Sequence, residues 1–159
     1  MTSTADLYDQ HGDALQSLPL QLRSFGGHAS FDGPIRTVRC FQDNALVKQI
    51  LAGPGGGAVL VVDGAGSLQT ALMGDMIAQS AVDSGWAGVV IHGCVRDSVA
   101  LAGMPLGVKA LGTNPRKSAK QGAGEVDGVV EFGGVVFRPG AHLFADEDGI
   151  LVTRVPSEA

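Results

Sequence analysis

The chain has 159 residues, of which 45% are hydrophobic, and a net charge of −5 from 16 acidic and 11 basic side chains. This composition predicts one compact globular domain over residues 1–159, excludes a disordered protein, and disfavours direct nucleic-acid binding, since no overall basic field is present. No apolar run reaches membrane-spanning length, and the acidic first twenty residues do not resemble a signal peptide. The two cysteines, Cys40 and Cys94, form no CxxC pattern, so we expect buried thiols in a cytoplasmic protein.

The first part of the chain predicts two helices and three strands. A cap at Ser3 or Thr4 begins the first helix, and Asp43-Asn44 caps the second. Asp32-Gly33 is a turn dipeptide. In chain order we expect a helix over residues 3–17, strands over 25–31 and 34–41 separated by that turn, a helix over 45–51, and a buried strand over 58–63.

The second part continues with a helix over residues 75–84, a strand over 88–93, a short helix over 98–102, a strand over 106–111, a polar loop over 112–117, and strands over 126–130, 135–138 and 149–154. The succession of strand, helix and strand from residue 58 to residue 93 is typical of a right-handed β-α-β crossover. We therefore expect an α/β fold with a central β-α-β unit, in a single layered β/β/α domain and not a doubly wound sheet.

Gly74-Asp75-Met76-Ile77 and Arg96-Asp97 are the most informative pair of segments, with twenty residues between Asp75 and Arg96. If the helix and the following strand pack antiparallel, the strand returns Arg96 and Asp97 to the beginning of the helix. Unpaired N–H groups there favour an anion, an arginine can grip a carboxylate, and Asp97 can hold a cation. The alternative is structural: Asp75 as an N-cap and Arg96-Asp97 as a charged turn.

Other residues admit simpler interpretations. The run Val61–Gly66 superficially resembles a glycine-rich nucleotide loop, as in a methyltransferase, but no helix follows at once and we interpret it as a turn. His92 is expected to be packed at a strand end, and Cys94 has no partner base. The basic residues Arg116, Lys117 and Lys120 form either a solvated loop or a cluster that attracts dianionic substrates. Asp146 and Asp148 are expected to order the turn before the last strand.

Five segments together resemble the RraA-like family, which also holds the class II 4-hydroxy-4-methyl-2-oxoglutarate aldolases. They are GDMIAQSA, the spacing of Asp75 to Arg96-Asp97, GVVIHGCVRD, LGTNPRKS and PGAHLFADEDGILV. The resemblance covers about residues 5–154. It implies a swivelling domain of the phosphohistidine type, assembled as a homotrimer with active sites at subunit interfaces. It also implies a pyruvate-like substrate and a divalent metal, usually Mg²⁺, with Mn²⁺ or Co²⁺ as alternatives.

Carried onto matching positions, the resemblance assigns a role to each residue. The backbone of Gly74, Asp75, Met76 and Ile77 would bind the substrate carboxylate. Arg96 would contact the carboxylate or keto oxygen and stabilise an enolate, and Asp97 would ligate the metal. Asp75 would orient a metal-bound water that acts as base. One metal-ligating carboxylate is enough for Mg²⁺, which keeps several waters.

The resemblance leaves two functions open. One is a lyase that releases pyruvate from 4-hydroxy-4-methyl-2-oxoglutarate or decarboxylates oxaloacetate. The longer aldolases carry a C-terminal extension with an acidic side chain, whereas this sequence ends at Ala159. Decarboxylation needs no hydroxyl deprotonation and is therefore expected to survive better than aldol cleavage. Ala141 stands where the family more often has Asp, and this departure is expected to affect a turn and not catalysis. The other function is non-enzymatic: binding and inhibiting a ribonuclease E-type endonuclease, with an acidic surface that masks a basic partner.

Overall fold

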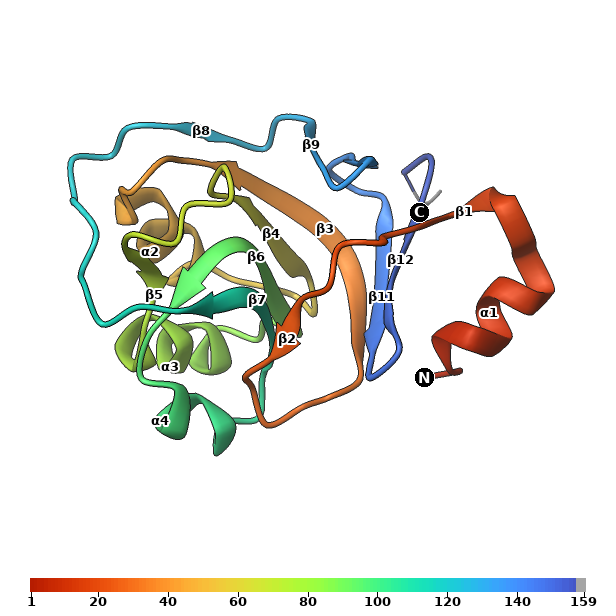
Figure 1. Cartoon of the computed structure of the whole chain (residues 1–159), viewed down its shortest axis with the longest axis horizontal. Coiled ribbons are helices and arrows are strands. Elements are labelled where there is room, and N and C mark those ends of the chain that lie inside the picture. The colour runs from red at the N-terminus through yellow and green to blue at the C-terminus, as the bar shows by residue number, and fades with distance from the viewer. Residues whose placement is uncertain (157–159) are drawn as a thin grey trace.

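A mixed sheet of ten strands forms the centre of the computed structural model, which describes residues 1–156 (Figure 1). Its central strands are parallel and lie in the order β3 (Phe31–Arg39), β4 (Val59–Asp63), β6 (Gly88–Val95) and β7 (Gly107–Thr113). Three short strands extend this part: β5 (Ala71–Met73) pairs with β6, β2 (Arg23–Ser24) with β7, and β8 (Glu125–Val126) with β3.

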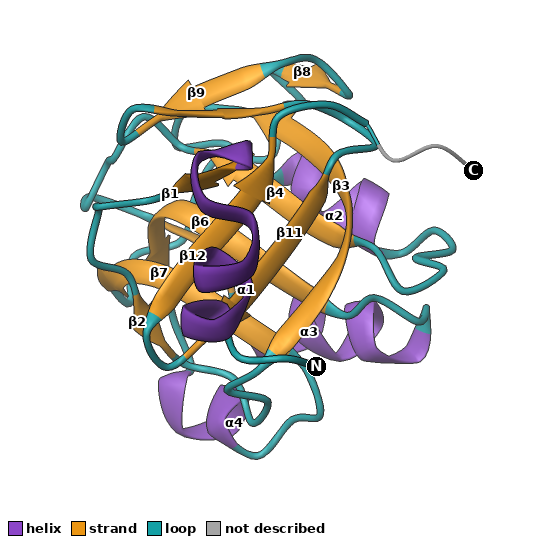
Figure 2. Cartoon of the chain, turned by 90° about the vertical axis from the view of Figure 1, so that its right-hand side faces the viewer, coloured by secondary structure: helices purple, strands orange, loops and turns teal. Residues whose placement is uncertain are grey.

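The first half of β3 carries the sheet into an antiparallel section. There it pairs with β11 (His142–Asp146), which is followed by β12 (Gly149–Thr153) and β1 (Leu15–Ser17). A separate hairpin of β9 (Val130–Phe132) and β10 (Val135–Phe137) packs nearby. Helix α1 (Thr4–His11) lies across β11 and β12, in front of the parallel strands in Figure 2.

The parallel strands are buried on both faces, as their β-branched sequences predict. Leu60 and Val62 pack with helices α2 (Ala45–Leu51) and α3 (Asp75–Asp83), whereas Val59 and Val61 pack with the antiparallel strands. The short helix α4 (Ser98–Ala102) follows β6. The fold is thus a mixed α/β protein with one large sheet and few helices, in which α3 joins β4 and β5 to β6.

Most predicted elements are confirmed, and the helices over 45–51 and 98–102 have the expected bounds. The predicted helix over 3–17 is wrong beyond His11. It ends there because Gly12 adopts a left-handed φ of 53°; a 3-10 turn (Gly12–Ala14) follows. Residues 15–17 instead pair with β12, which buries Leu15.

The predicted turn at Asp32-Gly33 is also wrong, because β3 runs through it without a break. Gly33 is needed for a close approach: a Cβ there would overlap the carbonyl of Gly57. The predicted strand over 126–130 is divided into β8 and β9, since Asp127 has a φ of 59°. Three strands, β2, β5 and β11, were not predicted, and the predicted strand over 25–31 is wrong, because residues 25–30 form bends and loop before β3.

Candidate functional site

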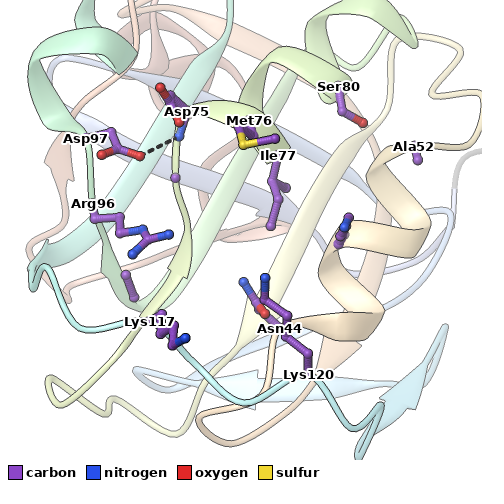
Figure 3. Close-up of a pocket in the computed structure, with 13 residues that line it drawn as sticks. Asn44, Ala52, Asp75, Met76, Ile77, Ser80, Arg96, Asp97, Lys117 and Lys120 are labelled. Atoms are coloured by element: carbon purple, nitrogen blue, oxygen red, sulfur yellow. Dashed lines mark hydrogen bonds between the residues drawn. The ribbon is translucent and has the colours of Figure 1, made fainter.

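The two ends of the central β-α-β unit meet, as the spacing of the sequence predicts. The N–H of Arg96 donates to the carbonyl of Met73 at 2.9 Å, which fixes the end of β6 beside the residue before Gly74. The N–H of Asp75 donates to Oδ2 of Asp97 at 2.9 Å (Figure 3). Gly74, and not Asp75, is the N-cap of α3, so Asp75 is the first residue of the helix.

Gly74 is required for this convergence. A Cβ at position 74 would lie 2.6 Å from Oδ2 of Asp97 and 3.2 Å from Cγ of Arg96. Its φ of −125° is open to any residue, so the restriction comes from these two side chains and not from the backbone. A Cβ at this position would force the Asp97 carboxylate to shift away from the start of α3, and glycine avoids that shift.

Asp97 adopts a left-handed conformation with φ 59° and ψ 42° at the N-cap of α4. Aspartate tolerates this conformation better than most residues, yet it remains unfavourable outside glycine. Its carbonyl accepts from the N–H of Leu101 at 2.9 Å, and its carboxylate accepts from Asp75. The strained residue therefore turns the chain into α4 while its carboxylate remains directed at α3.

Three N–H groups at the start of α3 remain available for a ligand. Within residues 1–156, the N–H groups of Gly74, Met76 and Ile77 have no hydrogen-bond acceptor, while Ala78 begins the helical pattern by donating to the carbonyl of Gly74 at 3.0 Å. Together with the positive end of the helix dipole, such groups favour an anion. Asp97 already occupies the fourth N–H, that of Asp75.

A cavity of about 230 Å³ opens over these groups. Its lining residues come from α2, β5, α3, the end of β6 and the loop after β7: Asn44, Lys48, Ala52, Ala71, Gly74, Asp75, Met76, Ile77, Ser80, Arg96, Asp97, Lys117 and Lys120. All six predicted site residues are among them. Four cationic side chains and two carboxylates share this lining, so the cavity is locally positive on a protein of net charge −5.

Sequence reasoning missed the part of the cavity that α2 provides. Asn44 and Lys48 lie about thirty residues before Gly74, and no local pattern connects them with the Asp75 motif. Lys117 and Lys120 were singled out as a basic cluster, and the structure places both in the lining; Arg116 of the same cluster does not line it.

The donor set suits a hydrated divalent cation. No group of three His, Cys, Asp or Glu side chains that could enclose a metal occurs in the described part of the chain. Asp97 uses Oδ2 for the N–H of Asp75, and its Oδ1 makes no hydrogen bond there. Mg²⁺ needs only one or two protein carboxylates when water and substrate oxygens complete its shell. Asp97, with Asp75 nearby, fits that pattern.

The glycine-rich loop after β4 is built as a turn. Within it, Gly64 and Gly66 both donate N–H to the carbonyl of His92 at 3.1 Å, Ala65 donates to Oδ1 of Asp63, and Ser67 donates to Gly64. Every N–H from residue 64 to residue 67 is thus used within the protein. The loop has none left to hold a nucleotide or a nucleotide-like cofactor.

The remaining singled-out side chains are structural. The imidazole of His92 stacks on Phe132 with ring centroids 4.6 Å apart, and Cys94 is buried without a partner base. Asp146 is buried and accepts the N–H and hydroxyl of Thr4 at 2.8 and 2.6 Å. Its Oδ1 also accepts the N–H of Asp148 at 3.0 Å, so it orders the predicted turn and anchors α1.

Fold and site together define a mixed α/β protein with a positively lined cavity where a β-α-β unit closes on itself. The Aldolase/RraA family model, described as RraA-like, matches residues 4–152, and the chain therefore belongs to the RraA-like family. None of the helices described is long and apolar enough to cross a membrane.

Solved structures of similar proteins carry different functional names. The chain is 53% identical to the S-adenosylmethionine:2-dimethylmenaquinone methyltransferase of Geobacillus kaustophilus HTA426, with a TM-score of 0.94 over 96% of this chain and 94% of that one. It is 48% identical to the RNA-processing inhibitor RraA of Thermus thermophilus, also with a TM-score of 0.94, over 100% and 96%. Streptomyces coelicolor RraAS2, of the RNase ES inhibitor family, is 28% identical, with a TM-score of 0.78 over 98% and 80%.

Proposed function

We propose that the cavity is the active site of a divalent-metal-dependent carbon–carbon lyase for 2-oxo acids. Its reactions are the cleavage of 4-hydroxy-4-methyl-2-oxoglutarate to two molecules of pyruvate and the decarboxylation of oxaloacetate. The observation that carries the proposal is the convergence of Arg96, Asp97 and the free N–H groups of α3 at one positive cavity. Arg96 and the N–H groups would stabilise an anionic substrate directly, and Asp97 would do so through the cation that it holds.

The chain's own residues would divide the work as follows. The N–H groups of Gly74, Met76 and Ile77 bind the carboxylate at C1. Arg96, whose backbone is fixed to Met73, presents its guanidinium to the keto oxygen at C2. Asp97 would hold the cation, most simply Mg²⁺, which supplies Lewis-acid polarisation of the keto group when bound.

Both reactions deliver an electron pair to the same atom. In aldol cleavage the C4 hydroxyl loses its proton and the C3–C4 bond breaks; in decarboxylation that bond breaks as carbon dioxide leaves. In each case the pair forms the enolate of pyruvate, and Arg96 stabilises the charge that grows on its oxygen. Asp75, half-buried at the first position of α3, would receive the hydroxyl proton through a water.

The assembly implied by the family is part of the proposal. Met76 and Val99 are 84% and 91% exposed, and they flank the site on α3 and α4. Apolar side chains so exposed beside a cavity support an interface there, in a homotrimer whose active sites lie between subunits. The finer description of the fold as a swivelling domain belongs to the same proposal.

Pyruvate release tests the proposal. We expect turnover of both substrates with Mg²⁺, above an enzyme-free control at the same metal concentration, and loss of turnover with a chelator. Arg96→Ala should lower kcat/KM by about 10²-fold or more, because a fixed cation at the developing charge is removed. Asp97→Ala should abolish the response to Mg²⁺. Arg116→Ala, which removes a neighbouring arginine outside the cavity, is the matched control and should keep wild-type rates. Wild-type rates in the Arg96 and Asp97 variants would refute the assignment.

A second candidate function is regulation of a ribonuclease E-type endonuclease. The names of the Thermus and Streptomyces relatives favour it, and the net charge of −5 suits a basic partner surface. An inhibition assay with the purified endonuclease distinguishes the two. Inhibition by wild type that survives Arg96→Ala, in a protein without lyase turnover, would support the regulator and contradict the lyase.

A further inference from the structure

The wall of the cavity that faces α3 is basic and is formed by two segments. Lys48 comes from α2, and Lys117 and Lys120 come from the loop over residues 114–124, here called the basic loop. In Figure 3, Lys117 lies on the side of Arg96 and Lys120 lies beside Asn44. None of these three lysines makes an ion pair within 4.0 Å in the described residues, although other charged side chains there are paired.

One end of the basic loop is fixed to β5. The N–H of Ala71 donates to the carbonyl of Arg116 at 2.8 Å, and the buried hydroxyl of Ser118 donates to the carbonyl of Ala71 at 2.7 Å. Oγ1 of Thr70 also lies 2.8 Å from Oγ of Ser118. Lys117 therefore projects from a backbone held on both sides, next to the strand that leads into α3.

Asp43 fixes the other end. Its buried carboxylate accepts N–H groups of Gln121, Gly122 and Ala123 at 3.0 to 3.3 Å. It also accepts the N–H of Ala45 at 3.1 Å, at the start of α2. Burial alone would raise the pKa of Asp43, but these four donors outweigh it and hold the pKa below its ordinary value. Asp43 thus joins the basic loop to the helix that carries Lys48.

The same junction is reinforced by backbone bonds. The N–H of Ala119 donates to Gln42 at 2.9 Å, and the N–H of Asn44 donates to Ala119 at 3.0 Å. Lys120 follows directly after Ala119, whose N–H and carbonyl are both hydrogen-bonded to the segment before α2. The backbone that carries Lys117 and Lys120 is therefore fixed beside the cavity and against the segment that leads into α2.

We infer that Lys48, Lys117 and Lys120 form a second anion subsite, which binds the distal carboxylate of a dicarboxylic 2-oxo acid, and that Asp43 is its positioning residue. The inference rests on the proposed function, in which α3 and Arg96 already bind the carboxylate and keto group at the other end of the substrate. A second anion between two segments that carry three unpaired cations lowers the net positive charge of the cavity.

This subsite also bears on which of the two reactions is favoured. In aldol cleavage of a 4-hydroxy-2-oxo diacid, the distal carboxylate keeps its charge throughout, so the lysines bind substrate and transition state alike. In decarboxylation of oxaloacetate, the distal carboxylate becomes neutral carbon dioxide, and lysines paired with it stabilise the ground state more than the transition state. The lysines therefore favour aldol cleavage over decarboxylation.

Binding of two matched probes tests the subsite without requiring turnover. 2-Oxoglutarate and 2-oxopentanoate have the same chain length, and only the first has a distal carboxylate. With Mg²⁺ present, calorimetry on the wild-type protein should show 2-oxoglutarate bound about 10-fold to 100-fold more tightly, the range of one to two charge-assisted contacts. The Lys117→Ala/Lys120→Ala double variant should remove most of this ratio, with Lys48 supplying the remainder, while leaving the affinity for 2-oxopentanoate unchanged.

Asp43→Asn tests the positioning role, since an amide accepts fewer N–H bonds than a carboxylate. It should lower the same ratio several-fold with 2-oxopentanoate binding retained, and Lys117→Arg/Lys120→Arg should restore most of the ratio lost in the alanine variant. Arg116→Ala, in the same loop but outside the lining, should leave it unchanged. An unaltered ratio in the double alanine variant, or equal losses for both probes, would overturn the inference. If Arg96→Ala abolishes the binding of both probes while the lysine variants change the affinity ratio as expected, the subsite stands. This holds whether or not the lyase assay detects turnover.

Discussion

Gly74→Ala is the sharpest perturbation of the candidate site, because it adds one carbon where two functional side chains touch the backbone. The added Cβ would lie 2.6 Å from Oδ2 of Asp97, and an ordinary contact begins near 3.4 Å, so that oxygen must retreat by about 0.8 Å. The move breaks its hydrogen bond to the N–H of Asp75 and displaces Arg96, whose Nε would be 3.3 Å from the new atom.

The expected effects on activity and on stability differ. A displacement near 1 Å at catalytic groups costs on the order of 10²-fold in rate, so kcat/KM for pyruvate release should fall by about that factor. The backbone angles at position 74 suit alanine, and Arg96 and Asp97 are exposed, so the free energy of unfolding should change by about 1 kcal/mol or less. Steady-state pyruvate assays and urea unfolding measure the two quantities.

Gly103→Ala is the matched control. It lies at the end of α4, where the nearest atom to an added Cβ is 3.7 Å away and φ is −93°. It should leave both activity and stability close to wild type. A Gly74→Ala enzyme with unaltered kcat/KM would refute the reasoning, because the close approach of Asp97 to α3 would then have no consequence for the reaction.

Three further outcomes follow from the structure. The pKa values of Asp43 and Asp146 are held below the ordinary carboxyl value of about 3.9. The stability that these carboxylates contribute is therefore complete above that pH and is lost as pH falls through their folded pKa values. In urea unfolding from pH 7 to pH 3, the free energy of unfolding should fall steeply below about pH 4, and Asp43→Asn should make this fall shallower. Burial raises the pKa of Cys40 to about 12, so iodoacetamide at pH 8 should modify it only in unfolded protein, and rapid labelling of the native protein would contradict its burial. The preference for 2-oxoglutarate over 2-oxopentanoate should shrink as KCl rises from 0.05 to about 0.5 M, since the lysines are exposed and screened; a salt-independent ratio would mean that their charge is not its source.

The β-α-β unit was predictable because its signals are local. A buried β-branched strand, an amphipathic helix and a second buried strand lie in order, and antiparallel packing of helix and strand with these lengths returns Arg96 to Asp75. The roles at the two ends of that unit follow from the resemblance to a family, and they remain proposals.

What sequence reasoning missed depends on contacts between distant residues. Gly33 lies in a dipeptide that is typical of turns, yet glycine is needed there because the carbonyl of Gly57 passes too close for a Cβ. Lys48 lines the cavity on α2, opposite a loop that Asp43 joins to that helix from almost eighty residues away. Neither effect leaves a local pattern. The hydrogen bond of Asp97 to the start of α3 likewise depends on a left-handed backbone that its sequence does not mark.

Exchange of the methyl protons of pyruvate in deuterated water tests the central claim most directly, because it needs only the enolate and no knowledge of the natural substrate. With Mg²⁺, the wild-type protein should remove the methyl signal from the proton NMR spectrum faster than an enzyme-free sample. Arg116→Ala should do the same and Arg96→Ala should not. Exchange no faster than in the enzyme-free sample, or exchange that Arg96→Ala leaves unchanged, would contradict enolate chemistry at this cavity.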